Sequence, residues 1–203
     1  MINAQVSYLA SFGSQLILGL LLVASFFVIA FYVERLLFFK KNFNRDINGL
    51  IKKLYTAANK TEVENILRSD KSAESAIVEK IVINPKVDSS DKLMATVVSE
   101  VEIERKNWER FILYFATVGS NAPFLGLLGT ILGLMQSFAD LALAEKLDTR
   151  VAMAGISYAL ITTVAGIIVA IPSIVIYNSL SKQVKTASQN TKAIARAVAN
   201  IIF

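Results

Sequence analysis

Thr130 and Thr163 are the side chains whose surroundings point most directly to chemistry, because each hydroxyl lies in a long apolar stretch. Glycines lie close to both, at Gly129 and Gly133 around the first and at Gly166 after the second. A hydroxyl in hydrocarbon can solvate a proton or an ion, but it cannot carry a proton by itself. The alternative is structural, since threonines in membrane helices commonly bond the carbonyl four residues earlier and help helices pack. If protons cross here, the titrating acid should come from another chain.

The sequence lacks the side chains of most enzymatic and metal sites. It contains no His and no Cys, which removes the commonest metal ligand, the usual general base and thiol chemistry. It contains neither a Gly-x-x-x-x-Gly-Lys phosphate loop nor a Gly-x-Gly-x-x-Gly turn. We therefore expect no enzyme activity, no metal and no cofactor.

The composition is that of an integral membrane protein, with 54% hydrophobic residues among 203 and a mean hydropathy of +0.53. Three stretches could cross about 30 Å of hydrocarbon as helices, at 13–39, 111–139 and 151–178. Lys and Arg are unevenly distributed, with none in 1–34, fifteen in 35–110, two in 111–150 and four in 151–203. This asymmetry predicts an exported N-terminus and a cytoplasmic C-terminus, and it explains the net charge of +5 without a nucleic acid partner.

We predict an all-α integral membrane protein with three transmembrane helices and long cytoplasmic helical extensions. Residues 1–12 form an exported or interfacial N-terminal segment, 40–110 a cytoplasmic helical domain, 140–150 an exported loop and 179–203 a cytoplasmic C-terminal helix. The last helix keeps a heptad-like repeat through Val184, Ala187, Thr191, Ala195, Val198 and Ile202. This repeat predicts packing on neighbouring helices; contact of the basic segment with anionic lipid is the alternative.

Local signals place breaks and helix starts between the first two spans. Thr61 with Glu64 fits a capping box, so a helix should begin there, and Asn84-Pro85 should interrupt the chain. From Ser90 to Val118 the sequence contains neither Pro nor Gly, which predicts one helix running into the second span.

A charged pair closes the first span, at Glu34 and Arg35. We expect an ion pair at the helix end, with Arg35 free to reach toward the headgroups; an intramembrane functional acid at Glu34 is the alternative.

Stripes of small residues run along the second and third spans. They comprise Ala122, Gly126, Gly129, Gly133 and Ser137 in the second, and Gly155, Ala159, Thr162 and Gly166 in the third. Such stripes allow another helix to approach closely. We expect that neighbour to be a helix of another protein. Pro123 and Pro172 should kink their helices.

Two segments resemble the ExbB/TolQ/MotA proton-channel family. The first is Ala122-Pro123-Phe124-Leu125-Gly126-Leu127-Leu128-Gly129-Thr130 with Gly133 and Ser137-Phe138, and the second is Ala159-Leu160 with Thr163, Gly166, Ala170-Ile171-Pro172 and Tyr177-Asn178. Asn121 to Phe124 and Gln136 to Phe138 look more like ExbB than TolQ.

The resemblance implies a pentamer in the bacterial inner membrane, with 1–12 and 140–150 periplasmic. Single-span ExbD- or TolR-like helices would bring an aspartate opposite Thr130 and Thr163. Protons would cross along Thr130, Thr163, Thr162 and Tyr158. Their passage would move the single-span helices against the pentamer, and that movement would act on a TonB- or TolA-like protein. Tyr158 departs from the family pattern, where a glutamate usually lies five residues before the threonine of the third span.

Three functions follow from these patterns. The first is a proton-channel subunit that energises TonB-dependent outer-membrane transport. The second is a TolQ-like subunit of the Tol-Pal envelope system, which shares the mechanism. The third is a membrane scaffold that oligomerises through its small-residue stripes without conducting, which the glycine pattern supports equally well.

Overall fold

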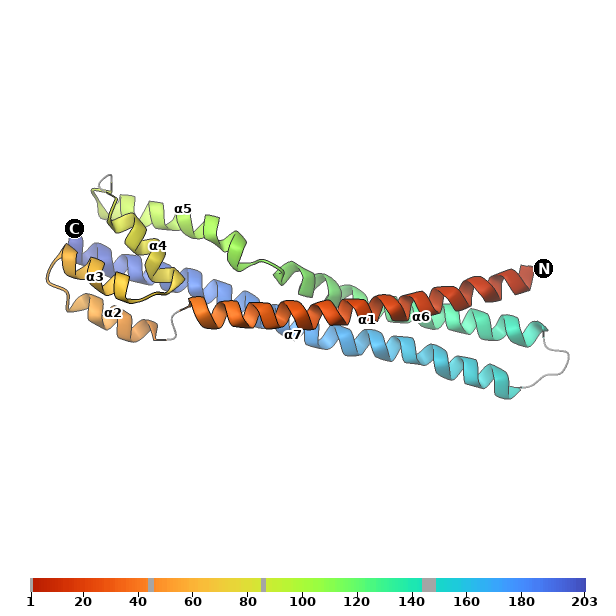
Figure 1. The fold of residues 1–203 in the computed structure, drawn as a ribbon. Coiled ribbons are helices and arrows are strands. Elements are labelled where there is room, and N and C mark those ends of the chain that lie inside the picture. Colours follow the sequence, from red (N-terminus) through yellow and green to blue (C-terminus); the bar gives the residue numbers. More distant parts are fainter. Residues whose placement is uncertain (1, 44–45, 85–86, 144–148) are drawn as a thin grey trace. The chain divides into compact units, whose positions relative to one another are not determined.

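The computed structural model describes residues 2–43, 46–84, 87–143 and 149–203. Every regular element in these ranges is an α-helix: α1 (Ile2–Asn42), α2 (Ile47–Tyr55), α3 (Lys60–Ser69), α4 (Ala73–Val82), α5 (Ser90–Trp108), α6 (Ile112–Leu143) and α7 (Thr149–Ile202) (Figure 1). Helices α1, α6 and α7 each contain a stretch long and apolar enough to cross a membrane. The predicted all-α fold with three membrane helices is thus confirmed.

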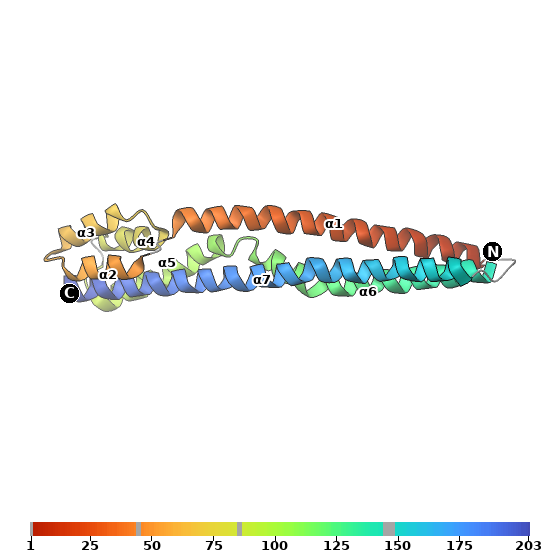
Figure 2. The same cartoon turned by 90° about the horizontal axis from the view of Figure 1, so that it is seen from below.

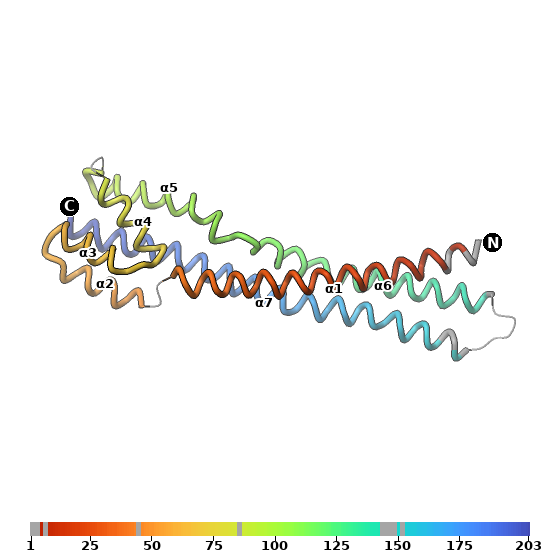
Figure 3. Tube along the Cα trace, viewed as in Figure 1, coloured from red at the N-terminus to blue at the C-terminus, as the bar shows by residue number. Residues whose placement is uncertain are grey.

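The chain forms two compact units. The membrane unit comprises Met1–Tyr32 and Phe111–Asn178, and the charged unit comprises Val33–Arg110 and Ser179–Phe203. Helices α1 and α7 contribute residues to both units (Figure 3).

In the membrane unit, α6 and α7 pack on each other and α1 packs against them. Its core contains Ile17, Leu21, Ala122 and Ala170, with Val118, Leu125, Leu132, Ala165 and Val169 packed around them. Large apolar side chains instead point outward, as Phe26 (66% exposed), Phe124 (70%) and Ile168 (64%) show. Large apolar side chains on the outer face are what a lipid environment favours.

The charged unit has the opposite arrangement. Helices α2 to α5 pack in sequence, each against the next, and the C-terminal part of α7 belongs to the same unit (Figure 2). Its core buries large side chains, including Leu54, Leu67, Val97, Trp108 and Leu180. The heptad positions from Val184 to Val198 are buried in α7, which confirms the predicted packing of the C-terminal helix.

The start of α3 differs from the sequence prediction. The N-cap is Asn59, whose side chain accepts a hydrogen bond from the Glu62 amide, while the Glu62 carboxylate accepts one from the Ala58 amide. Asn59 is therefore the N-cap, two residues before the predicted Thr61, and Glu62 takes the place predicted for Glu64 in bonding back to the backbone. The predicted break at Asn84-Pro85 falls between α4, which ends at Val82, and α5, which begins at Ser90, and Pro85 itself lies outside the described residues.

The prediction of one helix from Ser90 into the second span is wrong. Helix α5 ends at Trp108, and Phe111 has a φ of 64°, in the left-handed region that few non-glycine residues adopt. The Phe111 ring stacks on Phe31 with a centroid distance of 4.2 Å, and the Tyr114 hydroxyl donates to the Ala24 carbonyl at 3.1 Å. These contacts with α1 hold the first turn of α6 and stabilise the break.

The predicted boundaries of the N-terminal segment and of the loop between the second and third spans differ from those of the structure. Helix α1 already begins at Ile2, so the segment 1–12 is continuous with the first span and not a separate element. In the predicted 140–150 loop, α6 extends to Leu143 and α7 begins at Thr149, and residues 144–148 lie outside the described residues.

Candidate functional site

The two small-residue stripes face each other. A Cβ atom on Gly126 would lie 2.7 Å from the Thr162 carbonyl oxygen and 3.0 Å from the Thr163 Cα, so no larger residue fits without moving backbone. On Gly166 it would lie 2.5 Å from the Ala122 carbonyl oxygen. The close neighbour of α6 is therefore α7 of the same chain.

The remaining stripe residues extend this contact in register. Cβ atoms added to Gly129, Gly133 and Gly155 would meet the Thr162, Ala159 and Ser137 side chains, respectively. The expectation that another protein's helix lies against these glycines is wrong for this face. The reason is geometric, since two antiparallel helices joined by a short connection bring their stripes to the same depth.

The Thr130 and Thr163 hydroxyls contact each other at the interface between the two stripes. Their Oγ1 atoms lie 3.1 Å apart, so the two hydroxyls lie at the same depth in the facing helices. Thr130 Oγ1 also donates to the Leu127 carbonyl at 2.6 Å, and Thr163 Oγ1 lies 3.3 Å from the Gly126 carbonyl oxygen. Thr163 can therefore donate to either Thr130 or Gly126, so the pair can reorient without losing a hydrogen bond.

The accessibility of the threonines differs. Thr130 is 6% exposed and Thr162 fully buried, while Thr163 is half-buried. The Thr162 Oγ1 atom lies 2.7 Å from the Ala159 carbonyl oxygen and 3.0 Å from the Gly126 carbonyl oxygen, and its hydroxyl can donate to either. Thr162 is thus placed to hold α7 on α6, and Thr163 is the hydroxyl that a group outside the chain could reach.

Tyr158 lies away from the threonine pair. Its side chain is 47% exposed and lines a polar cavity of about 210 Å³ between α1, α6 and α7. The other lining residues are Ser11, Ser14, Gln15, Gly133, Gln136, Ser137, Asp140 and Gly155. Tyr158 and the stripe residues Gly133, Ser137 and Gly155 are predicted site residues. The other lining residues carry no signal in the sequence, because they come from α1 and α6 and share no local motif.

Both prolines lie inside continuous helices. Helix α6 contains Pro123 and α7 contains Pro172, and neither helix ends there. The Ser120 hydroxyl donates to the Ala116 carbonyl at 2.9 Å. Kinks at the two prolines stay a prediction.

The charged unit contains a second feature at the end of the first span. Arg35 is 2% exposed, pairs with Glu34 at 2.5 Å and donates to the Asn107 carbonyl at 3.1 Å. The predicted ion pair is confirmed, but the expectation that Arg35 reaches toward headgroups is wrong. Its guanidinium instead satisfies a carbonyl in the last turn of α5, where helical partners run out.

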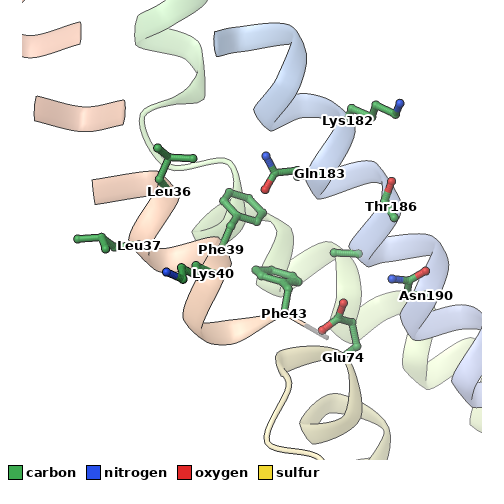
Figure 4. Close-up of a pocket in the computed structure, with 11 residues that line it drawn as sticks. Leu36, Leu37, Phe39, Lys40, Phe43, Glu74, Lys182, Gln183, Thr186 and Asn190 are labelled. Atoms are coloured by element: carbon green, nitrogen blue, oxygen red, sulfur yellow. The ribbon is translucent and has the colours of Figure 1, made fainter. Parts of the chain in front are cut away.

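The charged unit also holds a larger, mostly apolar cavity of about 620 Å³. Phe39 and Phe43 point into it from α1 and the residue after it, Glu74 comes from α4, and Gln183 lies opposite on α7 (Figure 4). These residues lie in three separate parts of the sequence, so no motif predicted them.

A model of the MotA/TolQ/ExbB proton channel family matches residues 38–193, a range that includes both threonines and both stripes. The chain therefore belongs to this family, as its motifs predicted, and it is a multi-pass membrane protein.

Its relatives include ExbB and TolQ proteins. An ExbB-like 2 biopolymer transport protein of Helicobacter pylori is 52% identical over 68 residues, which cover 34% of this chain and 45% of the relative. The biopolymer transport protein ExbB of Aquifex aeolicus is 38% identical over 96 residues, covering 47% and 64%. The Tol-Pal system protein TolQ of Pseudomonas aeruginosa is 32% identical over 123 residues, covering 59% and 51%. Each of these matches spans less than two thirds of the relative's own length.

Proposed function

We propose that this chain is the proton-channel subunit of an inner-membrane motor that uses the proton motive force to energise TonB-dependent outer-membrane transport. The observation that carries the proposal is the pair of Thr130 and Thr163 hydroxyls, 3.1 Å apart on facing apolar helices of a proton-channel family member. A hydroxyl pair that can exchange donors is suited to solvating a proton acceptor within hydrocarbon.

The acid opposite this pair comes from a partner. Among the described residues of the membrane unit, Asp140 is the single carboxylate, and it lies ten residues after Thr130, about 15 Å along the helix axis. Asp140 is too far away to bond the threonines. The half-buried Thr163 hydroxyl is what the membrane aspartate of an ExbD-like single-span protein would contact.

The assembly follows the family pattern. We propose a homopentamer around the ExbD-like helices, coupled to a TonB-like protein, with the N-terminus periplasmic and the C-terminus cytoplasmic. The uneven distribution of Lys and Arg supports this orientation, because fifteen of 21 fall in 35–110. The proton is the transported ion, and no enzyme activity, cofactor or nucleic acid partner is proposed.

A TolQ-like role in the Tol-Pal system is the second candidate, and the TolQ relative supports it. The hypothesis of a non-conducting scaffold is less well supported. That hypothesis relied on free small-residue stripes for oligomer contacts, and the stripes of α6 and α7 are occupied by each other.

Proton flux through the reconstituted complex tests the proposal. The chain is co-purified with its single-span partner and placed in liposomes with an imposed pH gradient and membrane potential. Thr163→Val and Thr130→Val should each lower partner-dependent flux roughly tenfold or more, since a hydrogen bond to a charged group contributes about 1.5–3 kcal/mol. Thr117→Val is the matched control, because Thr117 is an exposed residue of α6 whose hydroxyl donates only to the Leu113 carbonyl at 2.9 Å.

Normal flux in both threonine variants would exclude a threonine-lined path. Absence of flux in the wild-type complex would favour a scaffold. A deletion strain separates the remaining two roles: loss of siderophore uptake supports the TonB-coupled role, and detergent sensitivity with normal uptake supports the Tol-Pal role.

A further inference from the structure

The polar cavity of the membrane unit is unusual for its surroundings. It lies between helices whose outer faces carry large apolar side chains, yet its lining includes three serines, two glutamines, Tyr158 and Asp140. Ionisable side chains within a membrane protein often mark paths for ions or protons.

The cavity can hold water. Its volume of about 210 Å³ corresponds to roughly seven molecules at ~30 Å³ each. Ser14 and Ser137 are 2% and 5% exposed, and their hydroxyls donate to carbonyls of their own helices at 3.0 Å and 2.9 Å. Their oxygen lone pairs can then accept from water, and the amides of Gln15 and Gln136 add donors and acceptors. The lining therefore offers hydrogen-bond partners to water.

Asp140 gives this cavity its one carboxylate side chain. Asp140 and Arg150 are the only acidic and basic residues among the described residues of the membrane unit. Tyr158 lines the cavity from α7, and α1 contributes Ser11, Ser14 and Gln15. A carboxylate facing confined water is suited to taking up and releasing protons.

The cavity points from the end of α6 toward the threonines. Asp140 lies three residues before the end of α6, and Gly133 forms the wall nearest the threonine pair. Gly133 follows Thr130 by three residues, about 4.5 Å along the helix axis. Water in the cavity thus comes within about one helical turn of the hydroxyl pair.

We propose that this cavity is the hydrated proton entry of the channel from the exported side, and that Asp140 is its proton-loading group. The Asp140 carboxylate takes a proton from hydronium, becomes a neutral carboxylic acid and releases water. It then gives that proton to a cavity water and returns to the carboxylate. The proton passes on toward the partner's acid beside Thr163. This inference rests on the proposed proton-channel function.

Flux measurements in the reconstituted complex test the role of Asp140. Asp140→Asn should lower partner-dependent flux roughly tenfold or more, as expected when a proton-transfer group is removed. Because Tyr158 lines the same cavity, the double variant Asp140→Asn with Tyr158→Glu should recover much of the flux. Glu102→Gln is the control, since Glu102 is an exposed carboxylate of α5 in the charged unit. Wild-type flux in Asp140→Asn would overturn the proposal while leaving the channel function intact, whereas a wild-type complex without flux would overturn the proposed function itself.

Thiol labelling tests hydration independently of flux and of the partner. The natural chain contains no Cys, so single-cysteine variants need no background changes. Ser137→Cys and Gln136→Cys should react with a membrane-impermeant thiol reagent added on the exported side. Ser173→Cys should not react, because Ser173 is fully buried and does not line the cavity. If the exposed control Arg150→Cys reacts while both cavity variants stay unlabelled, the entry is dry and the proposal fails.

Discussion

The membrane unit and the charged unit of this chain pack in opposite ways, and α7 shows both. In the membrane unit its Leu160 and Val164 are 58% and 54% exposed, while in the charged unit its Leu180 and Val184 are 0% and 2% exposed. The same residue types thus lie outside in one unit and inside in the other. The difference teaches that the surrounding solvent decides which side of a helix is its interior.

The physical cause is the loss of the hydrophobic effect in lipid. Lipid tails are as apolar as leucine, so burying leucine in the membrane unit gains little, and helices associate through close van der Waals contact and hydrogen bonds. Glycines and threonines therefore form the α6–α7 contact. In the charged unit, water drives large side chains inward and leaves ion pairs such as Arg68 with Glu79 on the surface.

The largest predicted effect sharpens this comparison directly. Leu67→Ala in the charged unit should cost about 2–5 kcal/mol of stability, because Leu67 is fully buried in a water-driven core. Leu160→Ala in the membrane unit should cost less than about 1 kcal/mol, since detergent or lipid replaces the lost contacts. Unfolding of the charged unit can be followed by fluorescence of Trp108, the only tryptophan, and circular dichroism reports the whole chain. Equal losses in the two variants would break the comparison.

Glycine substitutions come next in size. Gly126→Ala should destabilise the membrane unit by about 1–3 kcal/mol, because the new Cβ would meet the backbone of α7 at 2.7 Å. Gly19→Ala is the matched control on α1, where a Cβ meets nothing within 4 Å, and it should be neutral or stabilising by up to about 1 kcal/mol. Thermal unfolding in detergent, followed by size-exclusion chromatography, measures both. Similar melting temperatures for the two variants would contradict the close contact.

The smallest predicted effect is the loss of stability when the buried Arg35 of the charged unit is replaced. Arg35→Lys should lower its stability by about 1–2 kcal/mol, because an ammonium group cannot hold Glu34 and the Asn107 carbonyl with a planar fork. Arg68→Lys, at a side chain 68% exposed and paired with Glu79, should change stability by less than about 0.5 kcal/mol. Urea unfolding monitored by Trp108 fluorescence distinguishes the two. A loss at position 68 as large as that at position 35 would show that burial is not the deciding factor.

Much of the fold could be read from local patterns. The three spans, the break at Asn84-Pro85 and the matching depth of Thr130 and Thr163 follow from apolar length, turn residues and the counting of turns in a hairpin. The break before α6 could not be read in this way. Phe111 adopts its left-handed conformation beside Phe31, 80 positions earlier in the chain, and no local preference of phenylalanine predicts that conformation.

The sequence by itself determined the class of protein, because a membrane span and its orientation depend on composition and charge along the chain and not on distant contacts. It also determined that the family motifs surround two threonines. Only the tertiary structure decided which surface faces the glycines and where Asp140, Tyr158 and Ser14 come together. Small side chains specify that something approaches closely, but they carry no information about which helix does so, and a cavity exists only once three helices have packed.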